Sequence, residues 1–596
     1  MSSTRAPAGE PRSRRTRILL IVVAVVVILP VAVAAWVGVR GLLARGELES
    51  AVPLASRMQE QIVAGDPEAA QQTYVEFADH ASSAAALTSD PIWRGVEWLP
   101  VVGPNLTAVR EVAGVVDDVS RDAVAPLISL AGEIDATDFK PVDGAIDVDP
   151  LVAAQTDVAE ADAALQAAAD RVSRVDTSST IGAVTSATAE LRGVVTEASA
   201  TVDVIDRAVR LLPAVLGADG PRDYLLLFAN SAEVRATGGN PGSLAVLRTD
   251  GGRIELTQQA STANFPQYPE PVVELPAETL ALYGEATGRF MQSVNLTPYF
   301  PLTAELAREM WRIEFGTEVD GVISIDPVTL AYLLQATGPV TLPTGDVLTA
   351  ENAVQTLLVD AYTRYPEPAA QDAFFAGAAA TVFATVASGA FEPSALISAL
   401  AQAGDERRVY VWSADAGEQD ILAATTLQGT LPTSTDDTVR FGAYLNDATG
   451  SKMGSYLDVD FGLGQATCRE DGRPVHRVEV TLENTAPADA ATSLPGYVTG
   501  AGDYGVPPGN INTVVSVYGA PGMENMGVTR DDESIPFQPA FDREHPVSLL
   551  EIELAPGEST ILHFDWLGEA PFDGETVIES TPVIHLPETS NIGIEC

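Results

Sequence analysis

The sequence predicts a multidomain protein with one transmembrane helix, an α-helical hairpin or bundle that forms a stalk, an α/β domain and a C-terminal β-sandwich. An uncharged apolar run lies near the N-terminus, helical heptads follow it, and strands, first mixed with helices and then alone, fill the rest. With 596 residues the chain is long enough for several domains. We expect a cytoplasmic tail at 1–17, the transmembrane helix at 18–39, the helical stalk at 40–212, the α/β domain at 213–408 and the β-sandwich at 409–596.

The apolar run Ile18 to Val39 is long enough to cross a bilayer, because about 20 apolar residues span its hydrocarbon core as a helix. Five arginines and one acid precede the run, and such a basic cluster predicts a cytoplasmic N-terminus. A cleaved signal peptide is the alternative, since Ala32-Val33-Ala34 matches a cleavage site. The run is longer than a usual signal-peptide core and continues past that site, which favours an uncleaved signal-anchor. Both interpretations place the body outside the cytoplasm.

The net charge of −48 restricts the partners of this body. The first 17 residues carry +4, so the remainder carries −52. A body this acidic repels phosphate backbones, which excludes nucleic acid, and it also repels anionic lipid headgroups. We therefore expect a single-pass cell-membrane protein of the cell envelope whose body stands off the membrane surface. Arginine is the main basic residue, with Lys140 and Lys452 the only lysines, a bias typical of G+C-rich bacteria.

The clearest pattern in the stalk is a pair of heptad segments separated by a polar turn at 176–180. Two such segments predict an antiparallel helical hairpin that acts as a spacer, with a dimerising coiled coil as the alternative. The first segment has the rows Leu151, Val158, Leu165, Val172 and Ala154, Ala161, Ala168, Val175; the second has Ile181, Thr188, Val195, Val202, Val209 and Val184, Leu191, Ala198, Ile205, Leu212. Upstream, Trp93 and Trp98 stand in a Pro/Gly turn, and we expect both to be buried between helices, with a ligand platform as the alternative.

Strands and helices alternate from 213 to 408, which indicates an α/β domain. We expect strands at 224–228, 243–248, 253–257, 321–325 and 338–342, and helices at 303–315, 328–336, 349–363 and 368–389. After Arg408 the chain is rich in strands that alternate apolar and polar residues, as at 477–482 and 550–554, and this pattern favours a β-sandwich.

Metal and cofactor chemistry has no recognisable motif in this sequence. The five histidines lack zinc spacing, the acidic clusters lack a calcium-loop pattern, and no hydrolase motif is present. We therefore expect neither a metal nor a cofactor. Cys468 and Cys596 are the only cysteines, and outside the cytoplasm they are expected to pair as a disulfide, with two unpaired thiols as the alternative.

The stretch from Asn230 to Ser243 is the candidate ligand site, because it concentrates polar side chains and glycines between two predicted strands. Glycines allow a ligand to approach the backbone, consecutive amides can form an anion nest, and an arginine can add charge. In the alternative interpretation, the acid and the arginine brace a tight connection between the strands. The candidate ligand-binding residues are Asn230, Glu233, Arg235, Thr237, Gly238, Gly239 and Ser243. A second stretch, 295–301, frames Tyr299 and Phe300 with prolines and is expected to be a loop that faces the core, with a place in the lining of the same cleft as the alternative.

Three motifs resemble domain-of-unknown-function family 4012: residues 222–243, Val319 to Pro327 with Gly338-Pro339-Val340, and Asn446 to Lys452. The resemblance covers about residues 215–410. It implies a membrane-anchored bacterial protein without an assigned activity, associated with envelope polysaccharide. A more distant likeness is to the LytR-CpsA-Psr phosphotransferases, which share the anchor and a strand, polar loop and strand. In this chain Ala236 to Ser243 occupies the place of their arginine-containing element, and this departure weakens the case for catalysis.

These observations lead to two hypotheses of function. The first is a membrane-anchored extracytoplasmic envelope protein that binds an envelope polysaccharide or a protein partner. The second is a phosphotransferase that acts on lipid-linked cell-wall glycopolymers, which would bind a lipid-linked glycan. A purely structural spacer is a third possibility.

Overall fold

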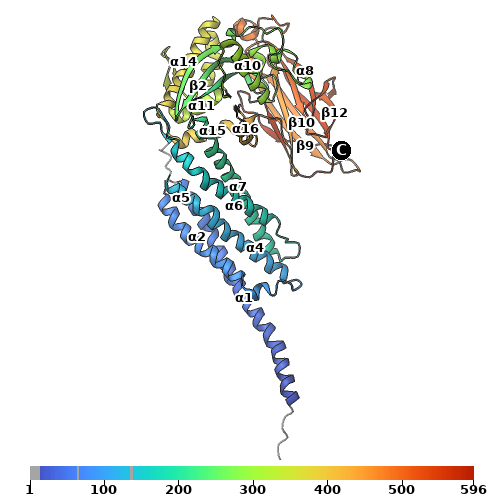
Figure 1. Cartoon of the computed structure of the whole chain (residues 1–596). Helices are drawn as coiled ribbons and strands as arrows, with labels where there is room; N and C mark the ends of the chain where they lie inside the picture. Colours follow the sequence, from blue (N-terminus) through green and yellow to red (C-terminus); the bar gives the residue numbers. More distant parts are fainter. Residues whose placement is uncertain (1–13, 64–65, 134–138, 596) are drawn as a thin grey trace, which may run out of the picture. The chain divides into compact units, whose positions relative to one another are not determined.

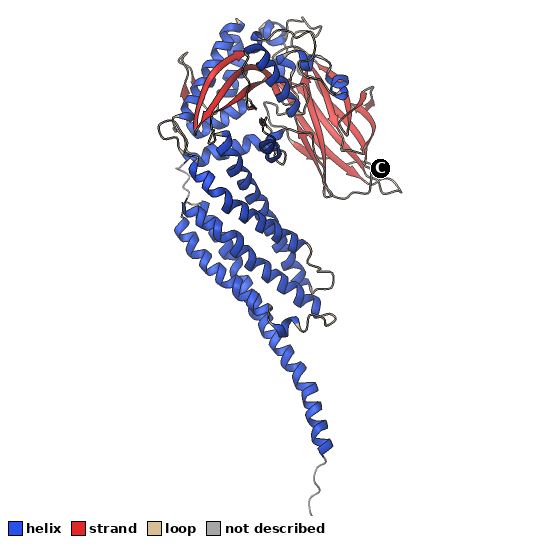
Figure 2. Ribbon diagram, in the orientation of Figure 1, coloured by secondary structure: helices blue, strands red, loops and turns tan. Residues whose placement is uncertain are grey.

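The computed structural model describes residues 14–63, 66–133 and 139–595, and for 14–25, 63 and 133 it describes the backbone alone. The chain forms two compact units. The first consists of Met1–Asp135 with Asp149–Leu212, and the second of Ala136–Val148 with Pro213–Cys596. The first unit is helical and the second contains all the large sheets (Figure 2). The protein is therefore multidomain, with helices toward the N-terminus and mixed sheets in the C-terminal half, as expected.

The first unit is a bundle of long helices, and α1 extends beyond one end of it (Figure 1). Asp66 and Asp90 cap the helices α2 and α3, each accepting hydrogen bonds from the amides of the first turn, and a proline follows each cap. The helices are α1 Arg14–Val63, α2 Pro67–Thr88, α3 Pro91–Arg94, α4 Gly103–Val119, a π-helical turn Ser120–Val124, α5 Ala125–Glu133, α6 Asp149–Ser173 and α7 Gly182–Val215.

Helix α1 is long and apolar enough to cross a membrane. A window of 18 residues within its described part, Val26–Ile62, has a mean hydropathy of 2.2, and Val26 to Leu29 are exposed. This is consistent with the expected anchor and equally with a signal sequence. Helix α14 (Pro368–Ala387) is also long and apolar enough to cross a membrane, but its side chains Phe374, Ala378 and Val382 pack into a core of the second unit.

Helices α6 and α7 run antiparallel along the predicted seam. The Gln155 side chain donates to the Val209 carbonyl, and the Arg192 guanidinium donates to the Val172 carbonyl. Both predicted rows of α6 are buried up to Val172. In α7 one row is buried (Thr188, Val195, Val202, Val209), while Ile181 at its start is exposed, as are Ile205 and Leu212 of the other row. The pairing supports a hairpin inside one chain, and α6 also packs against α4 and α5.

The two tryptophans of the Pro/Gly turn have different environments, and the expectation that both are buried is wrong for one of them. Trp93 is 1% exposed, packs against Val37 of α1 and donates its indole N–H to the Leu106 carbonyl. Trp98 is 77% exposed. Its indole N–H reaches back to the Gly95 carbonyl at 2.9 Å, so the tight turn itself satisfies the donor and holds the ring outside the bundle.

The second unit begins with a five-stranded mixed sheet in the order β3-β2-β1-β4-β7. Strand β1 pairs antiparallel with β2 and parallel with β4, and β7 pairs antiparallel with β4. The bounds are β1 Arg222–Arg235, β2 Gly238–Asp250, β3 Arg253–Ser261, β4 Gly321–Ile325 and β7 Val409–Ser413. Strand β7 was expected to begin the C-terminal domain, but it forms an edge of this sheet because it pairs along the whole length of β4.

Apolar side chains cover both faces of this sheet. Leu225 and Leu227 pack with helix α10 (Phe300–Phe315), whereas Tyr224 and Leu226 face the opposite side, where Phe383 of α14 lies. Successive side chains of a strand point to opposite faces, so the continuous apolar run 224–228 is what a strand buried on both faces requires.

Short helices and one small hairpin connect these strands. Asp326 caps α11 by accepting from the Thr329 amide at 2.7 Å, which ends β4 and starts the helix. The connecting elements are the 3-10 turn η3 Thr262–Asn264, α8 Ala277–Tyr283, α9 Ala286–Arg289, η4 Met291–Ser293, α11 Pro327–Thr337, the hairpin β5 Val340–Thr341 with β6 Val347–Leu348, the helical stretch α12 Ala353–Gln355, η5 Thr356–Asp360 and α13 Ala361–Arg364, then α15 Pro393–Asp405, α16 Ala416–Leu422 and η6 Thr426–Gln428.

Two further sheets share one apolar core. Their strand orders are β14-β15-β11-β8-β17 and β13-β12-β16-β10-β9-β18. Phe441 and Val515 come from the first sheet, and Val480 and Phe564 from the second, which is the arrangement that a sandwich interpretation requires. The elements are β8 Thr438–Asp447, η7 Met453–Tyr456, β9 Leu457–Ala466, β10 Val475–Asn484, α17 Ala490–Ser493, α18 Gly496–Thr499, β11 Ile511–Tyr518, β12 Glu524–Arg530, β13 Glu533–Ser534, β14 Gln538–Asp542, β15 His545–Leu554, β16 Ser559–Leu567, β17 Glu575–Ser580 and β18 Thr589–Asn591.

Two sequence expectations concern segments at the margins of these units. Residues 136–148 were expected in the stalk, yet they group with the second unit, where Ala145 forms an isolated bridge to Arg253 of β3. Cys468 lies after β9, whereas Cys596 lies outside the described residues, so the expected pairing of these two cysteines stays a prediction.

Candidate functional site

The candidate stretch 230–243 is a strand-turn-strand hairpin rather than an open loop, which corrects the expectation from sequence. Strand β1 continues to Arg235 and β2 begins at Gly238. Asn230 pairs with Asn240 and Val234 with Gly239, so Ser231, Ala232 and Glu233 form a bulge without partners in β2. A Cβ on Gly239 would lie 2.1 Å from the backbone carbon of Asn230, so the two strands can approach this closely only at a glycine.

The bulge divides its side chains between a core and a polar site. Ala232 and Val234 are buried in the core that the two C-terminal sheets share. Glu233 lies between them in sequence and therefore points the other way, as alternate residues of an extended chain do. Packing of β1 against that second core is the reason why a polar stretch remains extended well beyond the expected end of the strand.

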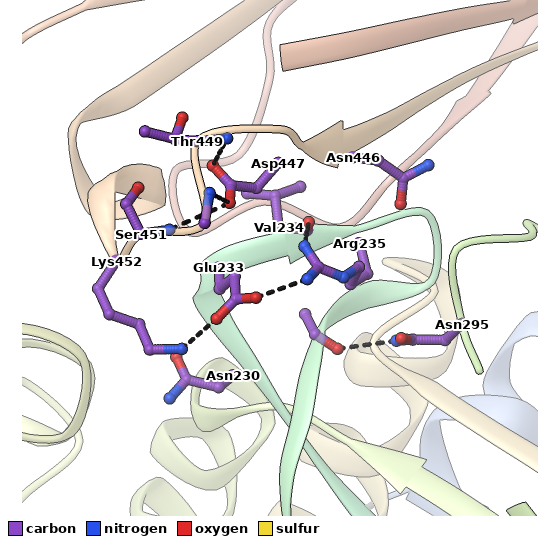
Figure 3. A network of polar contacts seen from close by, with 12 residues as sticks. Asn230, Glu233, Val234, Arg235, Asn295, Asn446, Asp447, Thr449, Ser451 and Lys452 are labelled. Carbon is purple, nitrogen blue, oxygen red and sulfur yellow. Dashed lines mark hydrogen bonds and ion pairs between the residues drawn. The ribbon is translucent and has the colours of Figure 1, made fainter. Parts of the chain in front are cut away.

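Glu233 forms a buried ion-pair network with Arg235 and Lys452 (Figure 3). The Arg235 guanidinium donates to Glu233 at 2.5 Å, and the Lys452 ammonium donates to its other carboxylate oxygen. Burial alone would raise the pKa of Glu233, but the charges of Lys452 and Arg235 outweigh it and lower this pKa to about 2. Burial would lower the pKa of Lys452, and the charge of Glu233 raises it instead. The network is therefore fully ionised at neutral pH.

Lys452 is held in place by the turn that follows β8. Asp447 accepts hydrogen bonds from the amides of Thr449, Gly450 and Ser451 at 3.2, 2.8 and 3.3 Å (Figure 3). Burial raises the pKa of Asp447. Directly before it, Asn446 accepts from the Ala236 amide at 3.1 Å and donates to the Leu296 carbonyl at 3.0 Å. The motif Asn446 to Lys452 thus contacts the β1–β2 hairpin, about 210 residues earlier in the chain, through both of its ends.

The hairpin and Lys452 border a cleft of about 1120 Å³ inside the second unit. Its walls come from β1 and β2, from α14, and from the turn at 450–452 and the loop at 496–504. Tyr362 is one of its lining residues, is 2% exposed, and its hydroxyl accepts a hydrogen bond from the Asn230 side-chain amide. Its ring lies 5.8 Å from that of Tyr497, which is 47% exposed. Tyr504, 69% exposed, covers Gly450, where a Cβ would collide with its ring.

The polar lining of the cleft consists of neutral groups and acids. Among the described lining residues, Lys452 is the one base, and its ammonium is paired with Glu233. Asp326 is paired with Arg408 at 2.8 Å. Asp372 and Asp503 add further negative charge, and the neutral polar side chains are Asn230, Asn240, Ser243, Gln259, Ser261, Thr262, Asn264, Gln292, Gln371 and Ser451.

The first half of this site lies in a segment with a recognised family model. Residues 219–362 match the model described as a protein of unknown function, DUF4012. This segment of the chain belongs to the family. The expected family assignment is thus confirmed over β1 to α13. Lys452, Tyr497 and Tyr504 lie beyond the DUF4012 segment, so the cleft is completed by residues that the family match does not cover.

The other comparisons add no functional information. Among curated proteins, none matches the sequence of this chain. One solved structure with a detectable match is a protein of Legionella pneumophila to which a nutrient-binding role is ascribed, with 10% identity and a TM-score of 0.15. The match covers 22% of this chain and 45% of that one, so this chain spans less than half of that structure. A likeness this weak carries no argument.

The predicted site residues divide into two groups in the DUF4012 hairpin. Asn230, Glu233 and Ser243 line the cleft. Arg235 and Thr237 are 7% and 3% exposed and are not part of its lining, and neither are Gly238 and Gly239. Gly238 has a φ of 119° and lies at the hairpin turn.

The bracing role that the sequence left open for the acid and the arginine agrees with this geometry. Arg235 donates to Glu233 and to the Val234 carbonyl, so its charge is engaged within the hairpin. The amides that an anion nest would need are already bonded, that of Ala232 to Asn230 and that of Ala236 to Asn446. The stretch 295–301 faces the core, as expected: the Asn295 amide group donates to the Gly239 carbonyl at 2.8 Å, and Phe300 is fully buried.

Sequence reasoning did not identify the aromatic residues of the cleft. Tyr362 lies inside a predicted helix with no feature that marks it. Tyr497 and Tyr504 lie in a segment, 494–505, that is unusually rich in glycine and tyrosine between two strands, and this composition is a signal for an exposed aromatic loop. Among the described residues, no group of three or more histidine, cysteine, aspartate or glutamate side chains is placed to hold a metal ion.

Proposed function

We propose that this DUF4012 protein is anchored in the membrane by α1 and binds an uncharged saccharide portion of an envelope glycan in the cleft beside Glu233 and Lys452. The anchor rests on the apolar run in α1 and on the arginines that precede it. The lining of the cleft supports the choice of ligand.

The observation that carries the proposal is the combination of tyrosine rings with amide, hydroxyl and carboxylate groups around a lysine that is paired with Glu233. Amide and carboxylate groups can bond to sugar hydroxyls, and the faces of Tyr497 and Tyr504 can stack against the apolar faces of sugar rings. Ligand sites commonly combine an apolar wall with a few fixed polar groups, and Phe228, Leu358 and Phe375 supply such a wall here.

The charge of the cleft disfavours the phosphotransferase alternative. A diphosphate is usually bound by arginines, lysines or a metal with free charge. Lys452 is paired with Glu233, and Asp372 and Asp503 would repel a phosphate that enters the cleft. A lipid-linked glycan would therefore be recognised through its sugars rather than through its phosphate.

The proposal can be tested by titrating the full-length protein in nanodiscs with neutral oligosaccharides released from envelope glycan, and separately with polyprenyl phosphate. Calorimetry should detect the oligosaccharide and no phosphate-dependent binding. Tyr497→Ala and Tyr504→Ala should each weaken binding by about 2- to 12-fold, because stacking on an aromatic ring contributes about 0.5–1.5 kcal/mol. Phe541→Ala, which removes an exposed ring of β14 outside the cleft, is the matched control. Unchanged affinity in both tyrosine variants, or tight binding of polyprenyl phosphate alone, would refute the choice of ligand.

A further inference from the structure

The turn between α3 and α4 presents an exposed apolar surface at one end of the helical bundle. Trp98, Val101 and Val102 are 77%, 78% and 49% exposed. We call these three residues the apolar tip. Most exposed apolar side chains of a soluble protein are isolated, so three within five residues of one tight turn require an explanation.

The tip is a rigid structure rather than a loose loop. A Cβ on Gly103 would lie 1.9 Å from the Glu97 carbonyl oxygen, so the turn closes tightly on that glycine. The Asn105 side chain donates to the Val101 carbonyl at 2.8 Å. Val101 has a φ of 71°, a conformation that is unfavourable for a β-branched residue. The fold thus maintains strain in order to hold an apolar side chain in solvent.

The position of the tip along α1 indicates what covers it. Trp93 and Val37 share one apolar cluster, against which both Val33 of α1 and Val96 of the turn pack. The apolar run of α1 ends at Val39, and Val33 lies about 9 Å before that end along the helix axis, at 1.5 Å per residue. The turn therefore descends beside the part of α1 that the anchor proposal places inside the outer half of the bilayer.

The chemistry of the tip fits the interface of a lipid bilayer. The Trp98 indole N–H is already bonded to the Gly95 carbonyl, so the ring can enter the acyl region without an unpaired donor. Glu97, the acid beside it, is neutralised by Arg110 at 2.7 Å. Arg94 is exposed on the same turn and can reach lipid phosphates. The turn thus lacks the excess negative charge that the body as a whole carries.

We propose that Trp98, Val101 and Val102 insert into the outer leaflet of the membrane next to α1 and fix the bundle upright on the bilayer as a second contact. This inference rests on anchoring by α1 and is independent of the ligand of the cleft. The turn between α6 and α7 lies at the same end, since the Asn105 side chain accepts from the Ile181 amide at 2.8 Å. Ile181 is 62% exposed and extends the apolar surface there.

The test uses the full-length protein in vesicles of phosphatidylglycerol and phosphatidylcholine whose acyl chains carry bromine near the glycerol end. Bromine quenches tryptophan on contact, and the difference between wild type and Trp98→Phe isolates the signal of Trp98. A second variant, Val204→Trp in the Trp98→Phe background, is the matched control. Val204 is 64% exposed in the same unit but lies 22 residues up α7 from Gly182, or about 33 Å away. Flotation with the vesicles reports on the anchor separately.

We expect the signal of Trp98 to lose about half or more of its intensity in brominated vesicles, and that of residue 204 to be unchanged. A floating protein with an unquenched Trp98 would overturn the inference while the anchor stands, and the tip would then be a contact for another protein. Equal quenching at both positions would also overturn it, because the bundle would lie flat on the surface. A protein that fails to float would refute the anchor and the inference together. The saccharide titration would still test the proposed ligand of the cleft independently.

Discussion

Replacement of Glu233 by glutamine is expected to open the β1–β2 hairpin, because it leaves two cations buried without their common anion. The side chains of Lys452 and Glu233 are 10% and 13% exposed, so water cannot compensate for the lost charge. Removal of one partner of a buried pair typically costs about 3–5 kcal/mol. The pKa of Glu233, lowered from 4.5 to about 2, leads to a similar value of about 3.4 kcal/mol at 1.36 kcal/mol per pKa unit.

Hydrogen exchange followed by mass spectrometry is the appropriate assay, because the protein has more than one cooperative unit and a single melting curve would mix them. Peptides that cover residues 226–240 should exchange about 300-fold faster at pH 7 in Glu233→Gln than in the wild type, as 3.4 kcal/mol corresponds to about 2.5 powers of ten. Lys452→Met should have a smaller effect, since Arg235 still pairs with Glu233. The double variant should lose less than the sum of the two.

The pH dependence gives an independent check on the same network. A carboxylate whose pKa is lowered by folding stabilises the native state above its unfolded pKa, and this contribution disappears as the pH falls toward the folded pKa. The difference between wild type and Glu233→Gln should therefore be complete above about pH 4.5 and decline toward pH 2. Glu255→Gln on the exposed side of β3 is the control. Equal exchange rates at pH 7, or a difference that persists unchanged at pH 2, would refute the interpretation of Glu233 as the ionised centre of the hairpin.

Three further predictions concern Gly239 of the hairpin and two buried side chains outside it, His476 and Asp162. Gly239→Ala should destabilise the hairpin by about 3 kcal/mol or more, because the new Cβ would collide with the backbone of Asn230, and limited proteolysis should be faster. Gly242→Ala is the control, because its Cβ would meet open space and proteolysis should be unchanged. His476 is fully buried without a hydrogen-bond partner among the described residues, and burial lowers its pKa from 6.5 to about 4. The free energy of unfolding of the second unit should therefore fall by about 2 kcal/mol between pH 6.5 and pH 5, because the unfolded state binds a proton there that the folded state does not. Denaturant titrations of His476→Phe should lack that loss, and a pH dependence identical to that of the wild type would contradict the assignment. Asp162 is buried in the α6–α7 seam, and burial raises its pKa because it disfavours the charged carboxylate. Asp162→Asn removes that charge and should raise the melting temperature of the bundle at pH 7. A lower melting temperature would show that the carboxylate is needed there.

The order of element types was predictable because it depends on short-range patterns. The apolar faces of α6 and α10, the strand at 321–325 and its capped helix α11 all follow from periodicity and from Asp-Pro signals within a few residues. The ends of β1 and β2 were not predictable, because the polar stretch is held extended by contacts with β8 and the turn after it, more than 200 residues away. Trp98 was misjudged for a related reason, since burial of an aromatic residue depends on which neighbouring helix reaches it.

The candidate site shows the same division. Residue types alone pointed to the stretch from Asn230 to Ser243, and the resemblance linked it to the motif Asn446 to Lys452. Which of these side chains face a cleft was decided by the bulge at 231–233, which turns Glu233 toward Lys452 and leaves Arg235 and Thr237 buried.

By itself, the sequence determined the apolar run of α1, the acidic body, the succession of helices and strands and the family of the 219–362 segment, because each of these depends on composition or on spacing along the chain. The tertiary structure alone decided that Glu233 is shared between Arg235 and Lys452, and that Tyr362, Tyr497 and Tyr504 meet across one cleft. The physical reason is that charge neutralisation and cavity shape arise from distances between segments remote in sequence, and no local pattern encodes those distances.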